Sequence, residues 1–337
     1  MTTNNELKPI LKWAGGKRLL IPAITKKMPE KMDRYIEPFI GGGAVFWNLA
    51  PEKAIISDLN SQLIETYQTI RDNHDGLVKK LNLMESRLGE IKKEYLALGT
   101  RGLNSRIEKF PKNNERSRKR IEEIGSLEEL EKKRVAAYLE AWNCEYEKIR
   151  NWDRNKESFE NRSSVDRSAR LIYLNHLAFN GLYRVNSNNE FNVPFGRYKS
   201  PKIFSAKLLE NMSLYLNENN VKIINCSFEE TISEAKHGDF IYADPPYAPL
   251  DGANSTFTTY SAEGFGIKQL EDLKASLDAA SARGAKWLMS NVSSKLTRTL
   301  FPLDEYIRTR IQVGRSINCD GEKRGKVTEL LISPKDF

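Results

Sequence analysis

The sequence has few cysteines and few histidines, with only three of each in 337 residues. Cys144, Cys226 and Cys319 lie far apart and lack the spacing of metal ligands, so we expect no disulfide framework, no metal site and a reducing cytoplasm. No apolar run approaches the roughly 18 residues of a membrane-spanning helix. Residues 1–8 lack the apolar core of a signal peptide. We therefore expect a cytoplasmic protein that makes no membrane contact.

Two nucleotide-binding signatures are also missing. Gly15 and Gly16 precede a lysine, but the Gly-x4-Gly-Lys-Ser/Thr spacing of a phosphate-binding P-loop is absent. The glycines at 41–43 do not form the Gly-x-Gly-x-x-Gly of dinucleotide folds, so a nicotinamide cofactor is disfavoured. The three histidines (His74, His176 and His237) lie away from the motifs described below, and we expect them to be structural.

Positive charge exceeds negative charge over the whole chain. The sequence has 53 Lys and Arg against 45 Asp and Glu, which gives a net charge of +8 and a pI near 9.1. This excess favours a polyanionic partner such as a nucleic acid, although a mildly basic enzyme would have the same composition. The length allows one large domain and a smaller one.

One short stretch combines a buried strand with a rigid turn. Residues 239–243 have the β-branched and aromatic composition of a strand, and Pro245 and Pro246 end it because proline cannot donate to a sheet ladder. Asp244 is therefore expected at the carboxyl end of a strand, where ligands bind in open α/β sheets. The turn presents Tyr247 beside it.

This set of groups suits an exocyclic amino group of a nucleobase. Such a nitrogen is a poor nucleophile because its lone pair is delocalised into the ring. A carboxylate and a carbonyl that accept its two hydrogens would return the lone pair to nitrogen, and an aromatic ring would stack on a flipped base. From these residues alone, an ordinary strand followed by a proline turn explains the pattern equally well.

Two earlier segments have the arrangement of a nucleotide-binding unit. Lys12-Trp13-Ala14-Gly15-Gly16-Lys17 is a basic glycine loop before an expected helix at 19–27. A strand at 34–37, a glycine turn at 38–43, a helix at 44–49 and a strand at 54–57 follow. Asp58 ends this second strand, where an acidic residue commonly holds ribose hydroxyls. A plain glycine turn would explain each segment taken alone.

The alternation of strands and helices returns after residue 220. Strands are expected at 221–225, 286–289, 305–311 and 327–332, and helices at 229–235, 267–282 and 293–300. Ser290 and Asn291 are expected to end the strand at 286–289. The loop at 256–260 could close over a substrate, and the basic loop at 315–324 could contact phosphate or form an exposed hairpin.

The middle of the chain has a different character. Residues 60–83 are expected to form one long amphipathic helix, and residues 128–149 another. The region 85–167 is rich in charges of both signs, and its basic run at 112–120 could touch phosphates or simply face solvent.

A helix at 168–179 leads into a segment of interleaved aromatic, Asn, Gly and Arg residues that ends at Tyr198. A short hairpin around Asn188 and Asn189 is plausible. Arginine can recognise guanine and asparagine can recognise adenine through paired hydrogen bonds. The aromatic rings could either line a base or fill a core.

The ordered set of motifs resembles one family, the D12 class of Dam-type DNA adenine-N6 methyltransferases. The motifs are, in order, Lys-Trp-Ala-Gly-Gly-Lys, Glu-Pro-Phe-Ile-Gly-Gly-Gly, Ser-Asp-Leu-Asn, Asn-Gly-Leu-Tyr-Arg with Phe-Asn-Val-Pro-Phe-Gly-Arg-Tyr, and Asp-Pro-Pro-Tyr-Ala-Pro-Leu. The resemblance covers residues 8–84 and 168–333. The region 85–167 is longer than in shorter family members.

The resemblance implies a Rossmann-like α/β catalytic domain at 1–59 and 216–337. It also implies a mainly helical recognition domain at 60–215 that carries a β-hairpin and the charged insert at 85–167. S-adenosylmethionine would be the methyl donor, with no metal. Residues implied for cofactor binding are Trp13, Ala14, Gly16, Lys17, Glu37, Pro38, Phe39, Gly41, Gly43, Asp58 and Asp244. The implied catalytic residues are Asp244, Pro245, Pro246 and Tyr247.

The implied partner is double-stranded DNA, which suits a cytoplasmic, nucleoid-associated enzyme of bacterial or phage origin. Implied DNA contacts are Lys12, Leu182, Arg184, Asn186, Asn192 and Pro194. The Asn-Gly-Leu-Tyr-Arg element favours GATC as the target, and a cognate restriction endonuclease is a possible functional partner. Alternatives are an enzyme acting on cytosine N4 or RNA adenine, and a non-catalytic DNA-binding protein.

Overall fold

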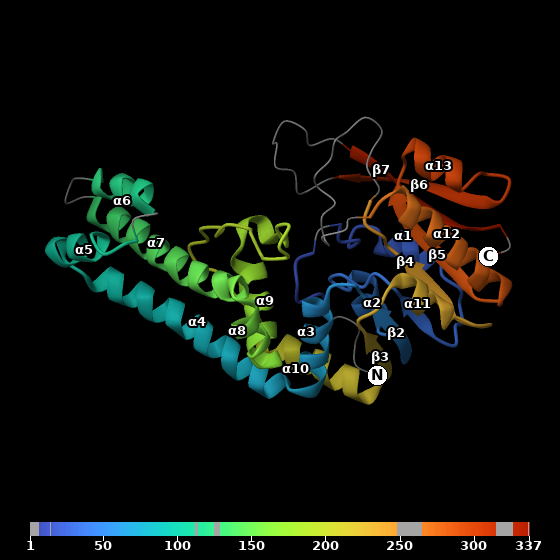
Figure 1. Cartoon of the computed structure of the whole chain (residues 1–337), viewed down its shortest axis with the longest axis horizontal. Helices are drawn as coiled ribbons and strands as arrows, with labels where there is room; N and C mark the ends of the chain where they lie inside the picture. Colours follow the sequence, from blue (N-terminus) through green and yellow to red (C-terminus); the bar gives the residue numbers. More distant parts are fainter. Residues whose placement is uncertain are drawn as a thin grey trace.

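The described strands form one mixed sheet (Figure 1). The structure is a computed structural model that describes residues 7–13, 15–111, 114–124, 129–247, 265–314, 326–335 and 337. The strand order is β3-β2-β1-β4-β5-β7-β6, with the first five parallel and the last two antiparallel. The strands are β1 (Tyr35–Glu37), β2 (Lys53–Ser57), β3 (Asn220–Ile224), β4 (Phe240–Ala243), β5 (Lys286–Val292), β6 (Tyr306–Gly314) and β7 (Lys326–Pro334). The predicted α/β class with a mostly parallel sheet is confirmed.

Alternation along the strands divides the sheet into two buried faces. Tyr35 and Phe240 belong to one hydrophobic cluster, whereas their neighbours Ile36 and Ile241 belong to the other. Successive side chains of a strand point to opposite faces, so apolar residues at every position require helices on both sides. The first face is covered by α1 (Ile21–Lys26), α2 (Ala44–Leu49) and α10 (Ala206–Glu218), and the second by α11 (Phe228–Ser233), α12 (Ile267–Ala282) and α13 (Lys295–Leu300).

The prediction of one long helix at 60–83 is wrong, because the chain forms two helices there. These are α3 (Ser61–Asp72) and α4 (His74–Ala97), which meet at Asn73. Asn73 has a φ of −150°, and its side chain accepts a hydrogen bond from the Gly76 N–H. Asn73 caps the start of α4, and this hydrogen bond replaces the continuation of α3. The apolar periodicity of the sequence continues through both helices, so it does not reveal the break between them.

The charged insert forms an elongated helical arm (Figure 1). Helix α4 and α7 (Leu130–Arg150) run side by side, and α5 (Thr100–Ile107) and α6 (Glu115–Glu122) cover their far end, away from the sheet. The 3-10 helix η3 (Asn151–Arg154) and α8 (Lys156–Glu160) lead back towards the sheet. The predicted helix at 128–149 is confirmed as α7.

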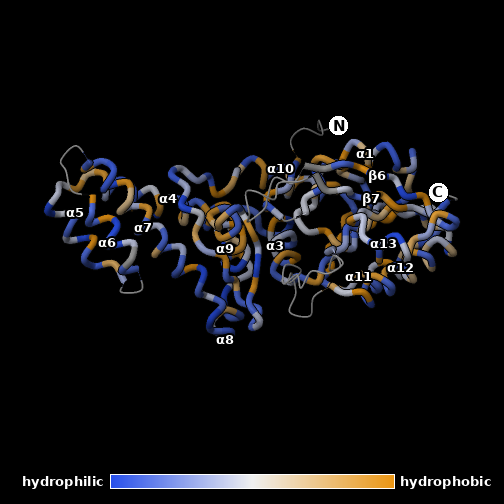
Figure 2. Tube along the Cα trace, turned by 90° about the horizontal axis from the view of Figure 1, so that it is seen from above, coloured by the Kyte–Doolittle hydropathy of each residue, from blue (hydrophilic) through white to orange (hydrophobic). Residues whose placement is uncertain are grey.

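Helix α9 (Ser164–Leu177) joins the arm to the rest of the molecule and is followed by the 3-10 helix η4 (Phe179–Gly181). It packs against α3, α4 and α7, and Figure 2 shows hydrophobic residues concentrated along it. Nine of its residues are buried, including the charged Arg170. Helix α9 is therefore the central helix among α3, α4 and α7. Of the helices in the described segments, none has the length and apolarity to cross a membrane.

Candidate active site and nucleic-acid interface

A cavity of about 790 Å³ opens at the carboxyl ends of β1, β2 and β4. The cavity forms there because the neighbours β1 and β4 lead to opposite edges of the sheet. The chain continues from β1 to β2 on one side and from β4 to β5 on the other, which leaves a crevice between their carboxyl ends. The predicted cofactor and catalytic residues that lie along its wall are Trp13, Gly16, Lys17, Glu37, Pro38, Phe39, Gly41, Gly43, Asp58, Asp244, Pro245, Pro246 and Tyr247. Residues separated by more than 200 positions therefore share one cavity.

The glycine turn after β1 is fixed at one side of the cavity. Gly41 has a φ of +46°, and a Cβ atom there would lie 2.8 Å from Cδ1 of Trp13, so both the backbone conformation and the close approach require glycine. The Gly41 N–H donates to Asp58 at 3.1 Å, and the Gly41 carbonyl accepts from the Tyr67 hydroxyl at 2.8 Å. Asp58 also accepts from the Asn60 N–H, and this couples the ends of β1 and β2.

Two carboxyl groups on this side are buried. Burial raises the pKa of Asp58, against the opposing effect of hydrogen bonds from Asn60 and Gly41. Burial also raises the pKa of Glu37 well above its ordinary value, although the Tyr35 hydroxyl donates to it at 2.6 Å. Glu37 is only 3% exposed. The folded chain therefore binds the Glu37 proton more tightly than the unfolded chain does.

This burial predicts a pH-dependent stability difference for Glu37→Gln. The folded state binds the Glu37 proton more tightly than the unfolded state does, so the wild type should lose stability as pH rises above the ordinary value of 4.5. The glutamine variant has no such proton and should gain relative to the wild type by on the order of 1 kcal/mol per pH unit until the folded-state pKa is reached. Urea midpoints of both proteins between pH 5 and 8 measure the difference, with exposed Glu52→Gln as control. Parallel curves for wild type and Glu37→Gln would contradict it.

A charged cluster forms the opposite side of the cavity. The ammonium group of Lys17 lies 2.8 Å from Asp244 and 3.8 Å from Glu329. The Tyr247 hydroxyl donates to Glu329 at 2.6 Å and accepts from Lys17 at 3.3 Å. Burial lowers the pKa of Lys17, but Asp244, Tyr247 and Glu329 together outweigh burial and raise the Lys17 pKa above its usual range. One buried cation thus balances two carboxylates.

The polar pair Ser290 and Asn291 was expected to end a strand, and that prediction is wrong. Both residues lie inside β5, which extends to Val292 and is buried from Trp287 onwards. The Ser290 hydroxyl donates to Asp244 at 2.8 Å and lies 2.9 Å from the Tyr242 hydroxyl. The Ser290 side chain is polar inside a buried strand because its hydroxyl bonds to the carboxylate that follows the neighbouring strand β4. The sequence alone gives no sign of this partner.

Two residues at or beside the cavity were not predicted from the sequence. Glu329 contacts Lys17 and Tyr247 of the cavity wall, and an acidic residue inside the apolar strand β7 is a signal of such a specific partner. Tyr183 lines the cavity, and its ring stacks on Trp13 with centroids 4.9 Å apart. Nothing in the sequence paired these two rings, because they lie 170 positions apart.

The segment 182–195 has one inward and one outward face. Tyr183, Val185, Phe191, Val193 and Phe195 are buried. The predicted DNA contacts Leu182, Arg184, Asn186, Asn192 and Pro194 are the even-numbered residues between them, and each is exposed or partly exposed. Phe191 and Phe195 therefore fill the core. The predicted hairpin exists as an antiparallel bridge between Val185 and Phe191, with no longer strands.

Lys12, in the segment before α1, is bonded through its backbone to α9. The backbone N–H and carbonyl of Lys12 both bond to the Asn175 side chain, each at 2.7 Å. The Lys12 ammonium group lies 5.5 Å from the centre of the Tyr198 ring. Ala14, the loops at 256–260 and 315–324, and Lys112 with Asn113 in the basic run lie outside the described residues.

The described histidines lie outside the cavity lining. The two ring nitrogens of His176 lie 2.7 and 3.1 Å from the carbonyl oxygens of Ile10 and Lys202. Within the described segments, no three His, Cys, Asp or Glu side chains are grouped as metal ligands.

The fold and the cavity together define a methyltransferase-type α/β enzyme, and comparison with known proteins identifies the family. The family model of D12 class N6 adenine-specific DNA methyltransferases matches residues 13–312. The chain belongs to this family, and its activity is accordingly adenine-N6 methylation of DNA.

Three relatives match along almost their entire lengths. The Type II methyltransferase M1.LlaDCHI of Lactococcus lactis subsp. cremoris is 37% identical, over 97% of this chain and 95% of the relative. The Type II methyltransferase M.MjaIII of Methanocaldococcus jannaschii is 33% identical, over 97% and 99%. The DNA adenine methylase of Haemophilus influenzae is 32% identical, over 96% and 92%.

Proposed function

We propose that this chain transfers the methyl group of S-adenosylmethionine to N6 of an adenine flipped out of duplex DNA, within the sequence GATC. The observation that carries the chemistry is Asp244. It lies at the end of β4 on the cavity wall, is held by Lys17 and Ser290, and is followed by two prolines and Tyr247.

The glycine-turn side of the cavity fits the methyl donor. Gly41, Gly42 and Gly43 line the cavity without side chains, so a ligand can approach the backbone there, and the carboxyl group of Asp58 at the end of β2 suits ribose hydroxyls. Phe39 offers a ring beside them. When bound, S-adenosylmethionine would supply a methyl group made electrophilic by its sulfonium centre. Trp13 and Lys17 would border the same ligand, and Glu37, Pro38 and Gly43 would complete the turn around it.

Asp244 and the Pro245 carbonyl would accept the two N6 hydrogens and so return the lone pair to nitrogen. Among the described residues, both partners of Asp244 contact Oδ1, which would leave Oδ2 to N6. Pro245 and Pro246 limit the backbone freedom of this turn. Tyr247 would stack on the base. Methyl transfer places positive charge on N6 beside the carboxylate, and N6 then loses one proton.

The outward face of the hairpin would lie against the DNA. Arg184 and Asn192 are bonded to each other at 2.8 Å across the hairpin, and both side-chain types form paired hydrogen bonds with base edges. Leu182, Asn186 and Pro194 share this face. Lys12 and the net charge of +8 would favour the phosphate backbone. The names of the two Type II relatives support a restriction endonuclease of the same specificity as a functional partner.

The test is to express the chain in a bacterial host without DNA methylases and to sequence the host DNA for modified bases. We expect N6-methyladenine in one short motif, GATC. A different motif would overturn the proposed specificity but leave the activity intact. Absence of N6-methyladenine from the host DNA, with soluble protein present, would overturn the proposed activity. N4-methylcytosine in the DNA or N6-methyladenine in the host RNA would then identify the acceptor instead.

A further inference from the structure

The recognition hairpin has little support of its own. Near the turn one bridge, Val185 to Phe191, joins its two sides, flanked by backbone hydrogen bonds from Asn186 to Glu190 and from Asn192 to Arg184. The next bridge, Ala178 to Phe195, lies at the base of the hairpin. An isolated two-stranded hairpin is at most marginally stable in water. Something outside the hairpin must therefore keep its outward face in one conformation.

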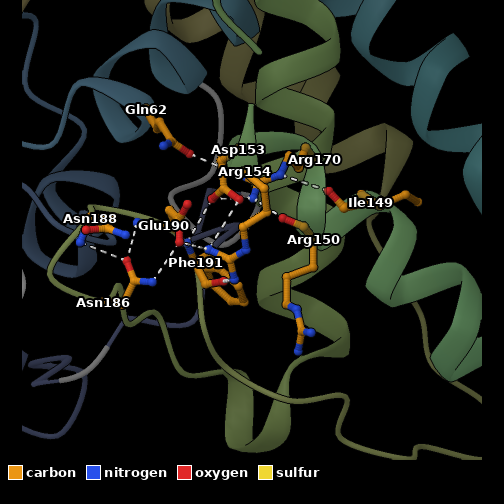
Figure 3. Close-up of polar contacts among 10 residues, drawn as sticks. All are labelled: Gln62, Ile149, Arg150, Asp153, Arg154, Arg170, Asn186, Asn188, Glu190 and Phe191. Atoms are coloured by element: carbon orange, nitrogen blue, oxygen red, sulfur yellow. Dashed lines mark hydrogen bonds and ion pairs between the residues drawn. The ribbon is translucent and has the colours of Figure 1, made fainter. Parts of the chain in front are cut away.

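The buried side chains of the hairpin pack in the core, and the Tyr146 hydroxyl of α7 donates to the Val193 carbonyl at 2.9 Å. The support nearest the turn comes from η3, at the inner end of the helical arm (Figure 3). In the bridge, the N–H and carbonyl of Phe191 point away from the opposite side of the hairpin. The N–H donates to Asp153 Oδ2 at 2.8 Å, and the carbonyl accepts from Arg154 Nη2 at 2.9 Å. Two consecutive side chains of η3 thus take the place of a third strand.

Arg154 also holds the neighbouring residue. Its other terminal nitrogen lies 2.5 Å from Glu190 Oε2, and the same oxygen accepts from the Asn186 side chain at 2.7 Å. Asn186 Oδ1 in turn accepts from the N–H groups of Asn188 and Glu190. The turn residues are therefore connected to η3 through one guanidinium group (Figure 3).

Asp153 is itself fixed by a buried arginine. Arg170 of α9 is 1% exposed, and its Nη2 lies 2.6 Å from Asp153 Oδ2. The same guanidinium donates to the carbonyls of Ile149 and Arg150, at the end of α7. These carbonyls are among those a helix leaves without partners at its carboxyl end. Arg170 thus joins the end of the arm to the carboxylate that holds Phe191.

We propose that Asp153 and Arg154 are specificity-positioning residues, which fix the hairpin so that Arg184 and Asn192 face the DNA in one arrangement. This inference rests on the proposed function of the hairpin. It gives the inner end of the charged insert a role in recognition, as the support of the hairpin. Loss of the support should weaken the discrimination between DNA sequences while leaving the cofactor cavity unchanged.

The test compares Arg154→Met with Arg150→Met. Both arginines belong to the same turn of the chain, but the Arg150 side chain points away from the hairpin in Figure 3 and lies 3.8 Å from Glu147. Methylation is measured on a duplex with the motif found by sequencing and on duplexes with one base pair changed. We expect Arg154→Met to raise KM for DNA and to reduce discrimination about tenfold, with the melting temperature and KM for S-adenosylmethionine close to wild type.

Glu190→Gln keeps the shape of the side chain and removes its charge, so it should reduce discrimination in the same direction by a smaller factor. The proposal would be overturned if the Arg154→Met and Arg150→Met variants had the same KM for DNA and the same discrimination between duplexes. A lowered melting temperature with normal discrimination would also overturn it, since Arg154 would then be merely structural. Failure of the wild type to methylate any duplex would overturn the proposed function instead and remove the basis of this inference.

Discussion

Asp244→Asn is expected to reduce the rate of methyl transfer by about 10²–10³-fold or more while DNA affinity stays close to that of the wild type. The asparagine oxygen can still accept the Ser290 hydrogen bond, now 2.8 Å long, so the side chain should keep its place. What is lost is the negative charge that, in the proposed function, lies beside the nitrogen that becomes positive during transfer. Losing one preorganised electrostatic contact of this kind typically costs that much. Single-turnover methylation measures the rate, and fluorescence anisotropy measures DNA affinity.

The matched control is Asp239→Asn, at the other end of the same strand. Asp239 is 1% exposed and pairs with Arg34 at 2.6 Å, outside the cavity. Its replacement should lower stability without changing the single-turnover rate of the folded fraction. Asp244→Ala should abolish methylation too, again with DNA binding largely retained. A fully active Asp244→Asn enzyme would remove this carboxylate from the mechanism.

Lys17→Met is expected to lower the free energy of unfolding by about 3 kcal/mol, the typical cost of removing one partner from a buried ion pair. Lys17 is 4% exposed, and its ammonium group lies between Asp244 and Glu329. Without it, the carboxylates of Asp244 and Glu329 lose the cation that they share. The raised pKa of Lys17 means that its contribution persists through neutral pH and is lost only above the ordinary lysine value of 10.5. Urea unfolding at pH 7 measures the change.

A second substitution identifies the cause. Glu329→Gln keeps an oxygen for the Tyr247 hydroxyl, now 2.6 Å away, and removes one negative charge. In the Lys17→Met background it should therefore restore about 1 kcal/mol or more, whereas in the wild type it should cost stability. This opposite sign is the signature of electrostatic coupling in a double-mutant cycle. Additive effects would show that Lys17 acts through packing instead.

Packed aromatic side chains connect the cavity to the hairpin. Trp13 stacks on Tyr183, and Tyr183 packs edge-on against Phe191 at 5.7 Å between centroids. Phe191 is the residue held by Asp153 and Arg154. Trp13 at the cavity and the hairpin proposed to face DNA therefore rest on one continuous set of packed side chains.

The sequence by itself determined the parts of the fold that depend on local patterns. The apolar runs at 239–243 and 54–57 became the buried strands β4 and β2, and the prolines at 245 and 246 follow directly after β4. Parallel strands align their carboxyl ends, so the sequence pattern already places Asp58 and Asp244 at one edge of the sheet. Alternation along residues 182–195 likewise follows from the period of an extended chain.

Only the tertiary structure decided which distant residues are partners. Ser290 looked like a strand terminator until β5 paired with β4 and brought it to Asp244. Glu329 gained a role because β7 pairs with β5 and so lies near Lys17 and Tyr247. Asp153 and Arg154 belong to a charged stretch with no motif, and the return of the chain along α7 places them against Phe191. Such contacts depend on how elements pack across the whole chain, and local periodicity carries no information about them.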